Sequence, residues 1–337
     1  MPARPSAPTE AVRLGISDAP REVAVVTAAY NMEAFVAATI ASVRAQSLEA
    51  FEMIVVDDGS QDRTAEIVSG IGDQRVRLIS IPNCGVSAAR NHGLAACTAP
   101  LVVFLDADDL LTPDALARMV AALKARPEAV ACFGHHVKID EHGAPVDGER
   151  PSALKRLPER DTLRHLIAKN VIVNGGALCI RTAAARRVGG YDPWLRFSED
   201  WEFWCRLAAL GDFVALPDLI AVQYRVRRSS ANTTLAGTPF HPNLEAIDRI
   251  YQAPAVRERF SGRALARSRR LAESNVHWSA ARNTLSERRL WRFAAYLVAG
   301  ALRYPESLLQ WRLAYLFVRS LLLARHRTGR AQRWQEG

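Results

Sequence analysis

Short apolar runs alternate with amphipathic segments along the first 137 residues of the chain. Continuous apolar runs predict buried strands at 22–27, 51–56, 76–81, 101–105 and 129–137. Between these runs, apolar residues recur at helical spacing and predict helices at 33–45, 62–68, 87–96 and 113–125. Strands that alternate with amphipathic helices indicate a mainly parallel, doubly wound α/β sheet that is flanked by helices.

The pattern becomes less regular after residue 137. Beyond a loop rich in Gly, Pro and Asp, the predicted elements are a helix at 161–168, a strand at 178–180, helices from Thr182 and Ser198, and edge strands at 213–216 and 221–225. From His241 on only helices are predicted, at 264–282, 290–302 and 308–324. We therefore divide the chain into a disordered leader (1–21), an α/β domain (22–240, with halves 22–137 and 138–240) and an all-helical extension (241–337).

The net charge of +9 is concentrated in the helical extension. Residues 241–337 contain 18 Arg, no Lys and 7 acidic residues, a net charge of +11, so the other 240 residues carry a net charge of −2. No nucleic-acid-binding motif accompanies this charge, so nucleic acid is not an expected partner. Apolar helices with Arg, Trp and Tyr are typical of segments that lie on an anionic membrane surface. The alternative is that they pack on the α/β domain or on a second subunit.

Cysteine usage and hydropathy bear on the compartment. The five cysteines show no CxxC spacing, which argues against a disulfide framework or a zinc site and indicates a reducing compartment. The Pro/Ala-rich first 22 residues lack the apolar core of a signal peptide, and no uncharged run reaches 18 apolar residues. We expect a cytoplasmic protein, peripheral on the inner face of the cell membrane if the extension binds lipid.

Three carboxylates follow the fourth predicted strand, at Asp106, Asp108 and Asp109. Ligands of open α/β sheets bind just outside the carboxyl ends of the strands. Acids this close together repel one another unless a cation lies between them, and hard oxygen ligands select Mg²⁺ or Mn²⁺. The alternative is a solvated acidic turn that caps the helix from Pro113.

Polar residues also follow the first two strands. The first strand leads into Tyr30 and Asn31, and Asn31 is expected to cap the helix at 33–45. The second strand ends in Asp57-Asp58-Gly59-Ser60, which is either a ligand-binding edge or only a turn with an Asx cap. The carboxyl ends of adjacent strands would bring these groups toward the acidic cluster.

Taken together, these motifs resemble glycosyltransferase family 2, whose members have the GT-A fold and use nucleotide-sugar donors. The resemblance covers about residues 22–230. The motifs that carry it are TAAYNME (27–33), VVDDGS (55–60), GVSAARNHGL (85–94), FLDADD (104–109), GGYD (189–192) and SEDWEFWCRL (198–207). Each motif alone is weak, whereas the set in this order and spacing is specific.

The resemblance implies a role for each matching position. Tyr30 would border the nucleotide base, Asp58 would hydrogen-bond it, and Arg90 would reach the base or diphosphate. The remaining residues of the donor site would be Thr27, Asn31, Glu33 and Asp106. Asp108 and Asp109 would hold Mg²⁺ or Mn²⁺ beside the diphosphate.

The same resemblance places the catalytic base of an inverting enzyme at Asp200. Beside it, Glu199 and Trp201 are candidates for supporting the base or lining the acceptor pocket, and the aromatic spacing favours the core for Trp201. The alternatives are that Glu199 and Asp200 only begin a helix, where acids favour the dipole, and that Trp201 belongs to the core.

The sequence departs from the family pattern in two places. Ala28-Ala29 stands where many members have a Pro-Thr or Thr-Ser pair, which leaves Thr27 as the nearest hydroxyl. Arg227 stands where members often have a His near the metal. An arginine cannot ligate a metal, but it can grip a diphosphate.

The function implied is transfer, with inversion, of a sugar from a nucleotide-diphosphate sugar, most typically a UDP-sugar, to a glycan or lipid-linked acceptor. One alternative is a nucleotide-sugar-binding module that has lost catalysis. A second is a sugar-phosphate nucleotidylyltransferase, which would need a Gly-rich phosphate loop after the first strand, and residues 28–31 contain no glycine.

Overall fold

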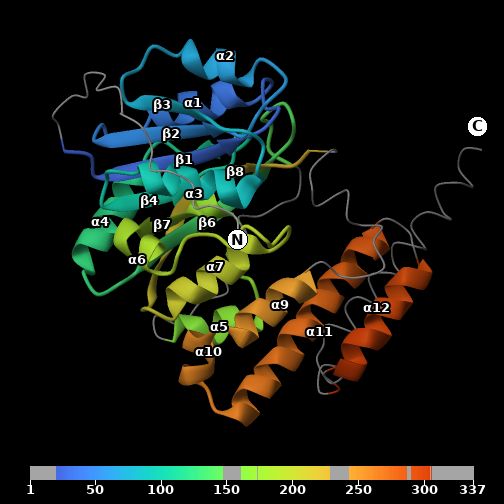
Figure 1. Ribbon diagram of the computed structural model, residues 1–337. Coiled ribbons are helices and arrows are strands. Elements are labelled where there is room, and N and C mark those ends of the chain that lie inside the picture. Colours follow the sequence, from blue (N-terminus) through green and yellow to red (C-terminus); the bar gives the residue numbers. More distant parts are fainter. Residues whose placement is uncertain are drawn as a thin grey trace, which may run out of the picture.

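The computed structural model describes residues 20–146, 161–172, 174–227, 243–286, 290–303 and 305. Most of the predicted leader and the helix predicted at 308–324 lie outside the described residues. The described part is built on one eight-stranded sheet, with helices on both of its faces (Figure 1).

The sheet is mixed, with the strand order β3-β2-β1-β4-β7-β6-β8-β5. Its strands are β1 (Val23–Ala29), β2 (Phe51–Asp57), β3 (Val76–Ser80), β4 (Leu101–Phe104), β5 (Leu110–Leu111), β6 (Ala131–Ile139), β7 (Leu178–Arg181) and β8 (Phe213–Arg225). Strands β1 to β4 are parallel, whereas β7 runs antiparallel to both β4 and β6. The predicted α/β sheet is therefore confirmed.

Helices flank this sheet, and further helices follow it in the chain. The flanking helices are α1 (Val36–Arg44), α2 (Thr64–Ser69), α3 (Val86–Ala96), α4 (Ala115–Ala125), α5 (Thr162–Ala168), α6 (Thr182–Arg187) and α7 (Glu199–Ala208), with the short 3₁₀ helix η1 (Gly175–Ala177). The helices after residue 240 are α9 (Asn243–Gln252), α10 (Pro254–Arg259), α11 (Gly262–Ser286) and α12 (Leu290–Arg303).

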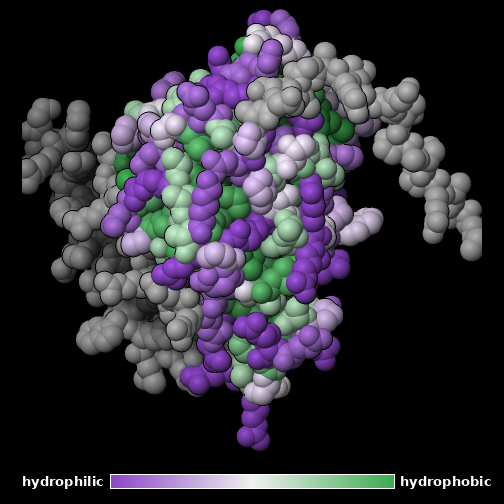
Figure 2. Space-filling view, turned by 90° about the vertical axis from the view of Figure 1, so that its left-hand side faces the viewer, coloured by the Kyte–Doolittle hydropathy of each residue, from purple (hydrophilic) through white to green (hydrophobic). Residues whose placement is uncertain are grey.

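Two hydrophobic cores lie on opposite faces of the sheet because successive strand residues point to opposite sides. In β1, Val23 and Val25 belong to the core under α1, α2 and α4, whereas Ala24 and Val26 belong to the core under α3, α6 and α7. On the outside, Figure 2 shows hydrophilic residues spread among smaller apolar areas. This two-sided burial explains why the strands appear in the sequence as unbroken apolar runs.

The helical extension packs on the α7 side of the domain. Ile247 and Ile250 of α9 and Val276 of α11 belong to the same core as α7. The Tyr251 hydroxyl donates to the Ile167 carbonyl at 2.8 Å. Among the described residues, no helix has the length and apolarity needed to cross a bilayer. Packing on the α/β domain, one of the two alternatives for the extension, therefore accounts for α9 and α11.

One prediction for the sheet is wrong. The segments predicted as two edge strands at 213–216 and 221–225 form the single strand β8, which lies inside the sheet between β6 and β5. The exposed Pro217 and Asp218 interrupt the apolar pattern. A register shift between Phe133 and His135 of β6 accommodates the extra residues of β8, so pairing resumes beyond them.

Gly93 on α3 marks a close approach between this helix and β1. A Cβ atom at this position would lie 2.3 Å from the Val26 Cγ1 and 3.3 Å from the Val56 Cγ2. Both valines are fully buried and restricted at χ1, so neither side chain can readily move to make room for the added methyl group.

We therefore predict that Gly93→Ala lowers the free energy of unfolding by about 1–2 kcal/mol, because overpacking outweighs the gain in helix propensity. Urea unfolding measures this change. His92→Ala, an exposed position on the same helix, is the control and should be near neutral. A stabilised Gly93→Ala protein would show that α3 does not approach β1 this closely.

Candidate active site

The candidate site lies at the carboxyl ends of β1, β2 and β4. The parallel register pairs Ala29 with Asp57 and Val26 with Phe104, so these strands end along one edge of the sheet. The polar residues that follow each strand therefore gather at this edge, as expected for a ligand site of an open α/β sheet.

Asp58 fixes the loop that leads into α3. Its side chain is buried, and its two oxygens accept hydrogen bonds from the backbone N–H groups of Cys84 at 2.7 Å and Gly85 at 2.9 Å. The Asn83 side chain donates to the Asp58 carbonyl at 2.9 Å. The structure thus gives Asp58 a loop-anchoring role, and a contact with a nucleotide base stays a prediction.

The residues after β1 are tied to the loop after β2. Asn31 adopts a left-handed conformation with φ of 53°, and its side chain accepts from the Gln61 N–H at 2.8 Å. The Glu33 carboxylate accepts from the Arg63 N–H at 3.1 Å. Helix α1 begins only at Val36 and has no side-chain cap, so the predicted capping role of Asn31 is wrong.

Of the candidates around β1, Tyr30, Asn31 and Glu33 are exposed, and Tyr30 offers the largest apolar face. Its side chain is 42% exposed beyond the strand end. Thr27 is fully buried and its hydroxyl has no hydrogen-bond partner, so the structure does not support the predicted donor contact there. The side chains of Asn31 and Glu33 are already held by the neighbouring loop, which favours a structural role over donor binding.

Each of the first two acids after β4 is paired with an arginine. An Asp106 oxygen lies 2.7 Å from the Arg90 Nη2, and an Asp108 oxygen lies 2.6 Å from the Arg227 Nε. Burial and the Asp106 charge raise the pKa of Asp108, which Arg227 opposes. Arg227 therefore reaches the acidic cluster, whereas its contact with a diphosphate stays a prediction.

The third acid has a different environment. Asp109 is fully buried, and its oxygens accept from the Arg225 backbone N–H at 2.7 Å and from the Asn174 side-chain amide. Burial, together with Asp106 and Asp108, raises the pKa of Asp109 well above its usual range. These contacts tie β8 and η1 to the end of β4, which argues for a positioning role rather than the predicted metal-ligand role.

The acidic cluster offers few carboxylates for a divalent ion. Among the described residues, no group of three or more His, Cys, Asp or Glu side chains is arranged to hold a metal by itself. A Mg²⁺ ion that binds substrate phosphates needs only one or two protein carboxylates. Asp108, which is 13% exposed and paired with Arg227, is the candidate for such a contact, and a metal site there stays a prediction.

Helix α7 brings the last two acids to the site. It begins at Glu199, directly after Ser198, which has a left-handed φ of 53° and makes no side-chain cap. Glu199 pairs with the Nη1 of Arg90 at 2.9 Å, so the same guanidinium binds Glu199 and Asp106. The structure therefore brings the fourth strand end and the start of α7 together, although 93 residues separate them in the sequence.

Asp200 is partly buried in the first turn of α7. Burial and the adjacent Glu199 carboxylate raise the pKa of Asp200 to about 7, against the opposing effects of the Trp201 N–H and Arg90. A carboxyl group with a pKa near the working pH is suited to act as a general base.

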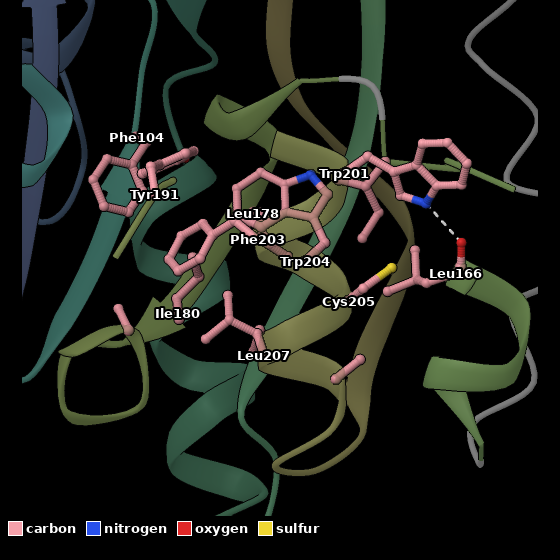
Figure 3. Packing of buried hydrophobic residues seen from close by; sticks show 14 of the residues in the cluster. Phe104, Leu166, Leu178, Ile180, Tyr191, Trp201, Phe203, Trp204, Cys205 and Leu207 are labelled. Carbon is pink, nitrogen blue, oxygen red and sulfur yellow. Dashed lines mark hydrogen bonds between the residues drawn. The ribbon is translucent and has the colours of Figure 1, made fainter. Parts of the chain in front are cut away.

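Trp201 belongs to the core rather than to an acceptor pocket. Its side chain is 2% exposed, and its indole N–H donates to the Leu166 carbonyl at 2.7 Å, the dashed line in Figure 3. The same view shows Phe203 and Trp204 of α7 packed near Tyr191 and Phe104. The structure therefore agrees with the interpretation that Trp201 belongs to the core.

Sequence reasoning missed three residues whose side chains hold the site together. The Asn91 side chain pairs with both backbone groups of Tyr191 at 2.8 Å, and Arg225 donates from its Nε to the Asp108 carbonyl at 2.7 Å. Asn174 binds Asp109, as described above. The sequence held only weak indications of their role: Asn91 directly follows Arg90 in the same motif, and Arg225 is the polar residue at the end of an apolar strand.

Comparison with known proteins is consistent with this geometry. The model of the family "Glycosyl transferase family 2" matches residues 24–189. The chain is 31% identical over 240 residues to the succinoglycan biosynthesis protein ExoO of Rhizobium meliloti (strain 1021), a match that covers 69% of this chain. It is also 31% identical over 185 residues to the amylovoran biosynthesis glycosyltransferase AmsE of Erwinia amylovora, covering 53% of this chain. The chain spans 66% of the length of each of these relatives.

A solved structure has the same fold. S. aureus TarS 1–349 in complex with UDP-GlcNAc superposes with a TM-score of 0.62 over 85% of this chain and 82% of that chain, at 18% identity. Together with the sequence relatives, the matched family model and the arrangement of the strand ends, this shows that the chain belongs to glycosyl transferase family 2.

Proposed function

We propose that this chain is an inverting glycosyltransferase that moves a sugar from a UDP-sugar to an acceptor hydroxyl during polysaccharide or glycolipid synthesis. Family membership and the names of two relatives, one for succinoglycan and one for amylovoran biosynthesis, support the polysaccharide assignment. The UDP-GlcNAc complex of TarS supports a UDP-sugar donor. The observation that carries the proposal is the position of Asp200, whose neighbour Glu199 shares the Arg90 guanidinium with Asp106.

The donor lies along the strand ends in this proposal. The exposed ring of Tyr30 offers a face on which a base can stack, and the Asp58-anchored loop lies beside it. Asp106, whose side chain is 37% exposed, accepts hydrogen bonds from the ribose hydroxyls. Arg227 provides charge-assisted hydrogen bonds for the diphosphate.

Sugar transfer requires a stabilised leaving group and an activated acceptor hydroxyl. Asp108 would hold Mg²⁺ or Mn²⁺, and the ion, when bound, would stabilise the negative charge of the leaving diphosphate. The acceptor hydroxyl is a poor nucleophile, so Asp200 accepts its proton as the new C–O bond forms. The bond between the anomeric carbon and the diphosphate breaks at the same time. Attack from the α7 side, opposite the diphosphate, gives inversion at that carbon.

Helix α12 offers a surface for a lipid bilayer. Trp291, Val298 and Leu302 are 70%, 58% and 77% exposed, and their spacing of seven and four residues places them on one face. Arg292 and Arg303 flank this stripe, in a segment rich in arginine. We infer that the α12 stripe rests on an anionic bilayer, where a lipid-linked acceptor would be presented.

Asp200→Asn should lower the rate of sugar transfer by at least about 100-fold while leaving UDP binding unchanged, because the amide cannot accept the proton. In the parent protein, kcat/KM should rise with pH through an apparent pKa of about 7, since only the ionised Asp200 is a base. UDP release over pH 5 to 9 measures both effects.

Asp114→Asn, the same change at an exposed carboxylate, is the matched control and should keep the profile. Loss of UDP binding in Asp200→Asn would instead indicate a structural role. Full donor binding without transfer in the parent protein would favour a binding module that lacks catalysis.

Asp108→Asn should weaken UDP binding in the presence of Mn²⁺ by at least about tenfold and leave the weaker metal-free binding unchanged. Isothermal titration with and without Mn²⁺ measures the difference. If the parent protein and Asp108→Asn bind UDP with equal affinity, both with and without Mn²⁺, that result would contradict a metal site at Asp108.

Replacing both Trp291 and Leu302 with Ser should reduce sedimentation with vesicles that contain phosphatidylglycerol by at least about tenfold, because two buried apolar side chains are lost. Vesicles of phosphatidylcholine alone should bind the parent protein weakly. Trp194→Ser, which removes a tryptophan that is 78% exposed elsewhere, is the control. Unchanged sedimentation of the double variant would rule out the α12 stripe as the contact.

A further inference from the structure

Arg90 occupies an unusual place between two carboxylates of the site. It extends from α3, its side chain is only 12% exposed, and its two terminal nitrogens lie 2.7 Å from Asp106 and 2.9 Å from Glu199. The guanidinium also lies over the Tyr191 ring, 5.0 Å from the ring centroid. A guanidinium whose two terminal nitrogens both bind carboxylates is fixed in position, whereas the predicted contact of Arg90 with the base or diphosphate stays a prediction.

The three elements that meet at Arg90 are remote in the sequence. Asp106 follows β4 at the donor end, and Glu199 is the first residue of α7, which also carries Asp200. Helix α7 starts without a side-chain cap. The Glu199–Arg90 ion pair is therefore a direct restraint on the turn that presents Asp200.

Five titratable groups interact with Asp200. Glu199 and Cys205 lie on the same helix, Arg90 comes from α3, Asp106 follows β4, and Tyr191 lies in the loop before α7. Of these five, only Arg90 carries a positive charge. Burial, Glu199 and Asp106 all favour the protonated form of Asp200, whereas the Trp201 backbone N–H and Arg90 oppose it.

We propose that Arg90 is a positioning residue that joins the donor end of the site to the base: through Asp106 and Glu199 it holds α7 in place, and its charge keeps Asp200 able to accept a proton. The inference rests on the proposed function for its consequence in catalysis. The effect of the Arg90 charge on the pKa of Asp200 can be measured without turnover.

The direct test is a pH titration of the full-length protein labelled with ¹³C at the aspartate carboxyl carbon and followed by NMR. The Asp200 signal is the one that disappears in Asp200→Asn. We expect its midpoint near pH 7 in the parent protein. Arg90→Gln should raise the midpoint by about one unit, and Glu199→Gln should lower it, because each variant removes a charge of opposite sign.

The double variant Arg90→Gln/Glu199→Gln gives the sharpest comparison. Its midpoint should return toward that of the parent protein, since one positive and one negative charge are removed together. Arg187→Gln, which removes a positive charge from an exposed position, should leave the midpoint unchanged. If Arg90→Gln fails to fold, Arg90→Lys takes its place: the midpoint should stay near that of the parent protein because the positive charge is kept, and a rise of one unit would overturn the role of the charge.

A purely structural Arg90 would give a different result. The midpoint would then stay in place, or it would move in the same direction in both single variants, and either outcome would overturn the proposal.

Turnover provides a separate readout. A rise of one unit in the pKa of Asp200 leaves about one-tenth of the base ionised at pH 7, so UDP release from UDP-GlcNAc should fall about fivefold and recover at pH 9. Absence of UDP release in the parent protein would count against the proposed function, while the NMR midpoints would still test the role of Arg90.

Discussion

Repulsion among carboxylates is the constraint on which this site depends. Asp106, Asp108, Asp109, Glu199 and Asp200 converge at one edge of the sheet, and like charges at such short range are unstable in a partly buried place. The chain balances them in three ways. Arg90 and Arg227 each pair with acids, backbone and amide N–H groups satisfy the buried Asp109, and the pKa of Asp200 rises so that the group is neutral part of the time.

The mixed sheet makes this convergence possible. Parallel β1, β2 and β4 place their carboxyl ends together, while the antiparallel β7 allows the chain to return and to present α7 on one face of the same sheet. The Asn91 amide then fixes the loop before α7 by pairing with the Tyr191 backbone. Buried aromatic rings around Tyr191 fill the space behind α7 (Figure 3). The position of α7 thus depends on packing, on the Asn91 hydrogen bonds and on the Arg90 ion pairs, and the same ion pairs contribute to the charge balance.

Sequence patterns predicted the strands well because β1, β2 and β4 are covered on both faces and appear as continuous apolar runs. The prediction for β8 was wrong because the exposed Pro217 and Asp218 interrupt the apolar pattern of what is a single strand. Motif positions identified Arg90, Asp106, Asp108 and Asp200 as site residues, but they could not show which contacts each side chain makes. Asp109 and Thr27 illustrate the limit, because only the three-dimensional structure reveals that both are fully buried. Tertiary contacts over 65 to 116 residues, such as those of Asp109, leave no local pattern in the sequence.

Thermal unfolding with nucleotides, each with and without Mn²⁺, tests most directly whether the strand ends form a nucleotide-sugar donor site. A ligand that binds only the folded state raises the Tm by mass action. The account predicts that UDP raises the Tm, that the increase is larger with Mn²⁺, and that CMP has little effect in either condition. An unchanged Tm with UDP, GDP and dTDP alike, in the presence of Mn²⁺, would contradict a donor site at the ends of β1, β2 and β4.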